Sequence, residues 1–245
     1  MAESVDISII RYSVRLITEK GALYILDNAV TSITWEEQEG QLAQKATVTV
    51  AAHGKVEGES IKSILKLNRT IRILANWGEG RKKLFEGFVW EWNYTHGQQK
   101  SMNIVAYDPM IRLQQSKDFK YFSKGMNTKA IIEAICGDWG VPLNYTWAHT
   151  ITHEKKVFKA NTISDMILEL LDEVKQQTES PYVTLYRDGK LEIAPYGANT
   201  DIYKFGGKDT ISTSDKLTMN NLVTRVKVFG KADDEGRAKV EATVD

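Results

Sequence analysis

The feature that most constrains this chain is a two-residue alternation of apolar and polar side chains, repeated from Tyr12 to about Asp108. In a strand, successive side chains point to opposite faces, so each alternating run predicts a strand with one buried face. Four short runs and two longer ones show this pattern: residues 13–17, 30–35, 45–50, 70–74, 83–95 and 99–107. The first part of the chain is therefore predicted to be a series of strands.

The connections between these runs indicate how the strands are arranged. Residues 96–98 contain Gly97 and separate the two longer runs, which favours a hairpin. Residues 59–67 are the only predicted helical interruption, about two turns with Ile61, Ile64 and Leu65 on one side. About six strands with one short helix are typical of a small antiparallel barrel or sandwich.

The pattern changes in the middle of the chain. Ile131, Ile132 and Ile135 recur at helical spacing and predict a helix over residues 127–139, with Asn127 as its cap. A second helix is predicted over residues 163–178, with Thr162 and Asp165 as a capping-box variant at its start. A hairpin is predicted over residues 182–194, closed by Asp188-Gly189. Residues 222–229 and 239–244 then alternate again, which predicts two further strands.

These patterns divide the chain into three predicted domains. Residues 1–112 are expected to form a first β-barrel, residues 113–200 an α+β insertion of two helices and a hairpin, and residues 201–245 part of a second barrel. The strand pattern is still running at Asp245, so we expect the second barrel to be incomplete in this chain. The predicted fold class is α+β, mainly β.

Charge and composition argue against several classes of function. Lysine plus arginine and aspartate plus glutamate both total 32, and residues 1–110, 111–200 and 201–245 are each balanced, with 13, 11 and 8 charges of each sign. Electrostatic binding to nucleic acid or to an anionic membrane therefore has little support. One cysteine excludes an internal disulfide, and no apolar run approaches the roughly 20 residues of a membrane span. We expect a soluble protein of a reducing compartment.

The sequence contains no familiar catalytic signature. The phosphate loop, the nucleophile elbow, the dinucleotide-binding glycine pattern and the Cys-x-x-Cys pair are all missing. We therefore expect no catalytic residue, no cofactor site and no metal site. His149 and His153 are four residues apart, but the β-branched residues between them disfavour a helix, and in a strand the two rings are too far apart to share a metal ion.

Two further candidates have simpler interpretations. Cys136 falls in the middle of the first predicted helix, where a buried, inert side chain is the expected role rather than a nucleophile. Glu36, Glu37 and Glu39 cluster after a predicted strand. A glycosidase needs two carboxyl groups facing each other across a sugar, which this cluster does not establish, so a solvated turn is expected.

Two aromatic segments suggest contact surfaces. Phe88, Trp90, Trp92 and Tyr94 alternate along one strand and are expected to share one face, which could fill the barrel, stack on sugars or bases, or form a protein interface. We expect most of this face to be core and part of it to serve as a subunit interface. A basic–aromatic segment is interpreted as a linker that packs on the barrel: Lys117, Phe119, Lys120, Tyr121, Phe122 and Lys124.

Several segments, taken in order, resemble one known family. They lie at residues 84–89, 104–109, 124–127, 130–136, 140–143, 182–193 and 220–226. Together they resemble the XkdQ/YqbQ-type hub proteins of PBSX-like prophages and phage-tail-like bacteriocins, in the late control protein D group of contractile-tail baseplate hubs. Each segment by itself is weak evidence for the family, and the ordered set covers nearly the whole chain.

This resemblance implies a structural role without enzymatic activity. It implies two tail-tube-like barrels separated by the α+β insertion, with three copies of the full-length protein forming a ring between the tail tube and the spike. The implied partners are the tube, the spike and LysM-carrying tail proteins, in a virion tail baseplate or tail-like particle assembled in the host cytoplasm. No membrane and no sequence-specific nucleic acid are implied.

Two alternatives remain open at this point. Residues 125–142 resemble half of a LysM peptidoglycan-binding repeat, so a tail component that binds the cell wall is the main alternative. A nucleic-acid-binding barrel is suggested by the aromatic strand and opposed by the neutral charge of every segment.

Overall fold

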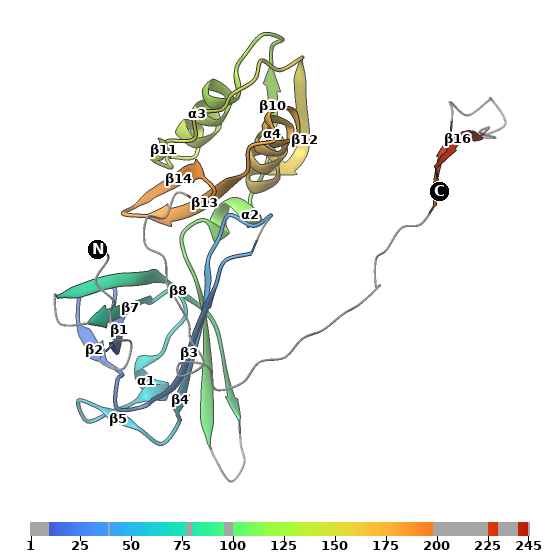
Figure 1. Cartoon of the computed structure of the whole chain (residues 1–245). Helices are drawn as coiled ribbons and strands as arrows, with labels where there is room; N and C mark the ends of the chain where they lie inside the picture. The colour runs from blue at the N-terminus through green and yellow to red at the C-terminus, as the bar shows by residue number, and fades with distance from the viewer. Residues whose placement is uncertain are drawn as a thin grey trace, which may run out of the picture. The chain divides into compact units, whose positions relative to one another are not determined.

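The computed structural model describes residues 10–38, 40–76, 80–95, 100–197, 225–229 and 240–244. Met1–Thr200 form one compact unit and Asp201–Asp245 a second. In the first unit a large β-sheet precedes a smaller part in which helices pack on short strands (Figure 1). No helix in the described ranges is long and apolar enough to cross a membrane.

Seven strands of the first unit form one antiparallel sheet, in the order β2-β1-β7-β8-β9-β4-β3. In chain order they are β1 (Arg11–Ile17), β2 (Leu23–Ile25), β3 (Val30–Glu36), β4 (Lys45–Ala51), β7 (Thr70–Asn76), β8 (Arg81–Thr95) and β9 (Ser101–Tyr107). All six predicted strands are confirmed, and so is the antiparallel hairpin of β8 and β9. The sequence analysis missed β2, which is only three residues long.

The sheet curves around its own core. The end strands β2 and β3 are joined by a tight turn, in which the Ala29 N–H donates to the Leu26 carbonyl at 2.8 Å. The rings of Tyr12 on β1 and Trp35 on β3 lie 6.1 Å apart, so the two ends of the sheet approach each other through side chains. Alternate residues of the strands fill the core, among them Leu16, Val48, Ile71, Phe85 and Ile104.

The predicted helix at residues 59–67 is shorter than expected. A two-residue pair, β5 (Lys55–Val56) and β6 (Glu59–Ser60), leads into a single turn, α1 (Ile61–Ile64). Ser60 caps this turn by accepting a hydrogen bond from the Ser63 N–H at 3.2 Å. The helix ends because Leu65 is extended and Asn68 is left-handed, with a φ of 62°, which turns the chain into β7.

The rest of the first unit is the α+β part that was predicted as a separate domain, and we call it the insertion. Its elements are α2 (Ile111–Gln115), β10 (Lys117–Phe122), α3 (Thr128–Asp138), β11 (Leu143–Tyr145), β12 (Lys156–Thr162), α4 (Ile163–Thr178), β13 (Tyr182–Arg187) and β14 (Lys190–Pro195). β10 pairs with β12, and β11 pairs in parallel with β14, which pairs with β13. The prediction of residues 117–122 as a linker was wrong, because they form the strand β10.

Both predicted helices of the insertion are confirmed together with their caps. The Asn127 side chain accepts from the Ala130 N–H at 2.8 Å, and the Thr162 hydroxyl accepts from the Asp165 N–H at 3.0 Å. These bonds satisfy N–H groups that the first turn of a helix leaves without an intrahelical partner. The hairpin turn at Asp188-Gly189 is confirmed as well, with a positive φ at both residues.

The first unit has two cores, which meet beside α2. The core of the insertion includes Ile131, Ile135, Ile167, Leu171 and Leu191. Leu42 and Ala43, which precede β4, belong to it too, as do Met110 and Ile111 just after β9. The two parts therefore share a continuous packed junction.

The second unit is described only in its two strands, β15 (Val226–Phe229) and β16 (Val240–Val244). They pair antiparallel, with a register shift at Val228/Phe229. This agrees with the predicted hairpin. The residues that join them, and residues 222–224 of the predicted first strand, lie outside the described ranges.

Candidate interaction surfaces

The aromatic strand β8 presents its four predicted side chains on two faces instead of one. The register of β8 against β9 shifts between Val89 and Glu91, so Trp90 is an extra residue that forms a β-bulge. One inserted residue exchanges the faces of everything that follows it. Trp92 and Tyr94 consequently pack against the core of the large sheet, whereas Trp90 is 46% exposed. The prediction of a single aromatic face was wrong.

Trp90 lines a hollow on the outer side of the sheet, and Phe88 contacts Arg112, another residue of its lining. The Arg112 guanidinium lies 4.7 Å from the centre of the Phe88 ring, and the Trp90 ring meets Tyr107 edge-on at 6.0 Å. The hollow has a volume of about 480 Å³ and is also lined by Trp139, Pro142 and Tyr186 of the insertion. It therefore presents two tryptophans and a cation to solvent, the residue types that are enriched in protein interfaces.

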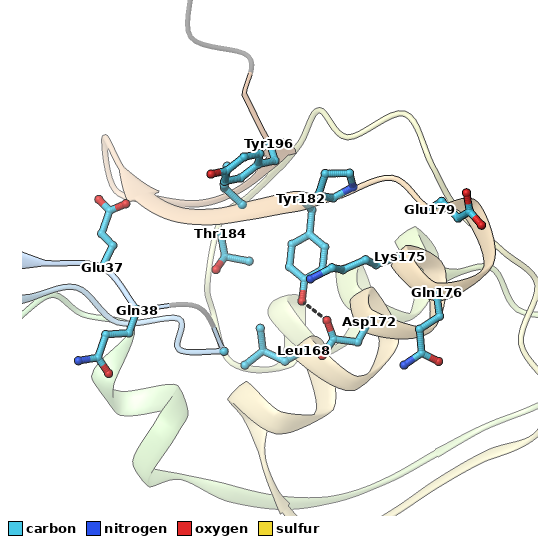
Figure 2. Close-up of a pocket in the computed structure, with 13 residues that line it drawn as sticks. Glu37, Gln38, Leu168, Asp172, Lys175, Gln176, Glu179, Tyr182, Thr184 and Tyr196 are labelled. Carbon is cyan, nitrogen blue, oxygen red and sulfur yellow. Dashed lines mark hydrogen bonds between the residues drawn. The ribbon is translucent and has the colours of Figure 1, made fainter. Parts of the chain in front are cut away.

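A larger groove lies where the loop after β3 faces α4 and β13. Its volume is about 1000 Å³. Figure 2 shows Glu37 and Gln38 on one side and Asp172, Gln176 and Glu179 on the other, with Tyr182 and Thr184 between them. We call it the acidic groove, because its lining has three carboxylates and one lysine: Glu37, Asp172, Glu179 and Lys175, together with Gln38, Gly40, Leu168, Gln176, Pro181, Tyr182, Val183, Thr184 and Tyr196.

Several polar groups of the acidic groove are held in place. The Tyr182 hydroxyl donates to Asp172 Oδ1 at 2.8 Å, which ties β13 to α4 (Figure 2). Glu37 accepts from the Gln44 side-chain amide, and burial raises the pKa of Glu37 above its ordinary value. Glu37 is nevertheless exposed to solvent, as the predicted solvated turn requires, and it forms one wall of the groove. Glu36 pairs with Lys45 at 3.1 Å, and Glu39 lies outside the described residues.

The basic–aromatic segment forms a second exposed surface. β10 and β12 pair with Phe119 opposite Lys159 and Tyr121 opposite Val157, and Lys117 lies on the same face of β10 by alternation. We call these five residues the lysine–aromatic face. Phe119 is 72% exposed, Tyr121 63% and Val157 47%.

The other lysines of that segment are neutralised. Lys120 points to the opposite side and pairs with Asp118 at 3.1 Å and with Asp138, while Lys124 pairs with Glu154 at 2.8 Å. Lys117 and Lys159 form no ion pair with any residue that the structure describes. The uncompensated charge of the segment therefore lies on the lysine–aromatic face.

The two candidate histidines have separate environments. His153 is buried, with Nε2 2.8 Å from Thr128 Oγ1 and Nδ1 2.9 Å from Glu173 Oε2, so both ring nitrogens have a protein partner. This contact ties the start of α3 to α4, a structural role that the sequence analysis missed. His149 lies beside Trp147, with ring centres 5.6 Å apart. No group of three metal-ligating side chains occurs in the described ranges.

Cys136 and Asp108 are both buried; the burial of Cys136 was predicted from the sequence, and the role of Asp108 was not. Cys136 lies in the core of the insertion as expected, and burial raises the pKa of its thiol to about 12, so the thiolate is scarce at neutral pH. Asp108 was missed as a site. It is 1% exposed at the junction of the two cores, and its carboxyl accepts from the Gln44 N–H at 3.0 Å and the Met110 N–H at 2.8 Å.

Three solved structures of tail proteins are similar to this chain. The 43 kDa tail protein of prophage MuSo2 from Shewanella oneidensis aligns with a TM-score of 0.62 and 12% identity, over 88% of this chain and 64% of that one. A tail protein from Neisseria meningitidis aligns with a TM-score of 0.62 and 10% identity, over 94% of this chain and 66% of that one. The prophage tail protein gp18 from Listeria monocytogenes aligns with a TM-score of 0.55 and 16% identity, over 95% of this chain and 67% of that one. The chain thus spans about two thirds of these structures and shares their fold.

The family comparison agrees with the segments noted in the sequence. No curated protein matches the chain. Residues 33–245, from within β3 to the end, match the model of a family described as YQBQ-like. This range contains every segment on which the resemblance to YqbQ-type proteins rests, and it covers most of the chain. The chain therefore belongs to the YQBQ-like family.

Proposed function

We propose that this protein is a structural component of a phage tail or a tail-like particle, and that it serves there as a subunit of the baseplate hub. The observation that carries the proposal is the fold that the chain shares with three tail proteins, two of them from prophages, along 88–95% of its length. Membership of the YQBQ-like family supports the same role. In the hub, three copies of the protein form a ring that joins the tail tube to the spike.

The described surfaces support a role in contact rather than in turnover. Two of the three carboxylates of the acidic groove, Glu37 and Asp172, accept hydrogen bonds from Gln44 and Tyr182, and Cys136 is a buried thiol with a raised pKa. We propose that the protein is not an enzyme. Purified protein is expected to leave cell-wall suspensions turbid, and clearing that is lost when a single acidic residue or histidine is replaced would contradict this.

We further propose that the outer hollow contacts a neighbouring tail component. Of the four aromatic residues predicted to share one face of β8, Trp90 lines this hollow and Phe88 contacts its Arg112, whereas Trp92 and Tyr94 pack on the core side. Trp90→Ala is expected to reduce incorporation into particles and leave the melting temperature nearly unchanged. Trp92→Ala is the matched variant, and it is expected to lower the melting temperature because it removes a core contact.

The hub proposal is tested in the bacterium that encodes the chain. Deletion of the coding sequence is expected to leave induced cells without complete tails, and a tagged copy is expected to restore them and to purify with the particles. Normal particles from the deletion strain would contradict the proposal. A tagged chain that is absent from purified particles would contradict it too.

The LysM-like alternative is not favoured by the fold. It requires a single strand closely after the second helix. Here β11 and β12 separate α3 from α4, and the hairpin of β13 and β14 follows α4.

A further inference from the structure

We propose that the lysine–aromatic face of one copy of this chain docks into the acidic groove of a second copy. The two surfaces share no residue and belong to different sheets, so the contact is heterologous, in which each copy offers one surface and receives the other. A heterologous contact generates a ring when the rotation between copies closes. The inference deepens the proposed hub function. It rests on that function only for the number of copies in the ring, which is three.

The apolar side chains of the lysine–aromatic face are exposed to solvent in the single chain. Phe119 and Tyr121 are among the most exposed large side chains of the described residues, and they stand side by side with Val157. An exposed apolar cluster rimmed by charges is typical of a protein interaction site. Because β10 and β12 are held from beneath by the buried rings of Phe122 and Phe158, which meet edge-on at 6.4 Å, the cluster is presented on a fixed support.

The charges of the face identify the occupant as acidic. Lys117 and Lys159 flank Phe119 and have no ion pair in the described part of the chain. Lys155, just before β12, is a third exposed lysine that no described residue neutralises. Three unpaired lysines around three apolar side chains complement a groove that is lined by carboxylates and aromatic rings.

The acidic groove has those properties. It offers Glu37, Asp172 and Glu179 to the three lysines, and its volume of about 1000 Å³ accommodates aromatic side chains. Tyr182, Tyr196, Leu168 and Val183 line it as well, so apolar and aromatic side chains stand among its charged groups. With three carboxylates and one lysine, Lys175, the groove is opposite in sign to the three lysines of the face.

The experiment is a charge exchange followed by sedimentation velocity over a range of protein concentrations. The face variant carries Lys117→Glu and Lys159→Glu, and the groove variant carries Asp172→Lys and Glu179→Lys. The parent chain is expected to self-associate, more weakly as salt is added. Each variant alone is expected to dissociate about tenfold or more readily, because like charges then meet. A chain that carries all four changes is expected to regain association.

Controls separate this contact from other effects. Lys55→Glu with Lys66→Glu changes the net charge equally at two exposed positions of the other part of the unit and is expected to leave association unchanged. Circular dichroism and melting temperature verify that every variant is folded. Glu179→Lys alone serves if the groove double variant is unstable, because Asp172 also holds Tyr182.

Four results would overturn the proposal: a monomeric parent chain, association that survives in the face variant, equal loss in the control, or no recovery in the chain with all four changes. Binding of a fluorescent single-stranded oligonucleotide by the parent chain but not by the face variant would assign the face to a nucleic acid instead. Incorporation into particles is measured separately. Normal incorporation of the face variant would reject this contact and leave the hub function standing.

Discussion

Replacing Asp108 by Asn tests the structure at the junction of the two cores. Burial raises the pKa of Asp108 to about 7, and the N–H groups of Gln44 and Met110 oppose this rise by stabilising the carboxylate. The ordinary value is 3.8. Between these two values the folded chain keeps a proton that the unfolded chain has released.

The sign and size of the effect follow from linkage. Because the folded state binds more protons in this window, stability is highest below about pH 4 and falls as the pH rises to about 7. Three pKa units correspond to about 4 kcal/mol, which is an upper bound for the loss. The Asn variant cannot titrate, so this component disappears from its pH profile.

The measurement is urea unfolding of both proteins from about pH 4 to about pH 8. At the acid end the variant is expected to be less stable by about 1–3 kcal/mol, because its amide NH₂ must face one of the two N–H donors. The difference is expected to shrink or reverse toward the alkaline end. Asp188→Asn makes the same change at an exposed turn and is expected to leave the slope unaltered. Parallel profiles for Asp108→Asn and the parent chain would refute the reasoning.

Three further predictions concern packing and backbone geometry. A Cβ on Gly87 would lie 2.3 Å from the Tyr107 carbonyl oxygen, so Gly87→Ala is expected to cost about 3 kcal/mol or more, whereas Gly137→Ala, in a helix with open space, is expected to gain up to about 1 kcal/mol in the same unfolding assay. Cys136→Ser is expected to lower stability by about 1–3 kcal/mol, and the parent thiol is expected to react slowly with maleimide until the chain unfolds; rapid labelling of folded protein would contradict its burial. Ala160, the extra residue of a bulge in β12, has a φ of 56°, so Ala160→Gly is expected to raise the free energy of unfolding by up to about 1 kcal/mol, and a lowered free energy would argue against that geometry.

The sequence predicted the elements whose signals are local. Alternation along β1, β3, β4 and β7 identified the strands, and caps such as Asn127 and Thr162 set the starts of the long helices. These features depend on residues within a few positions of one another. They therefore need no knowledge of which segments become neighbours.

The interaction surfaces depended on distant partners and were predicted only in part. The bulge at Trp90 exists because β8 must keep register with β9, and nothing within 88–94 marks the extra residue. β10 was misread because its alternation of charged and aromatic residues needs β12 to become a sheet. Asp108 carried one usable signal, since an Asp followed by Pro109 often accepts from a nearby backbone N–H, but its burial comes from packing against the loop before β4.

The central claim is that this chain is a structural subunit of the baseplate hub. Electron cryomicroscopy of purified particles at the end of the tail tube tests it most directly. The account predicts density for three copies of the seven-stranded sheet and its α+β insertion, arranged around the tube axis between tube and spike. Density for this fold along the whole tube, or its absence from the tube end in particles that contain the chain, would contradict the account.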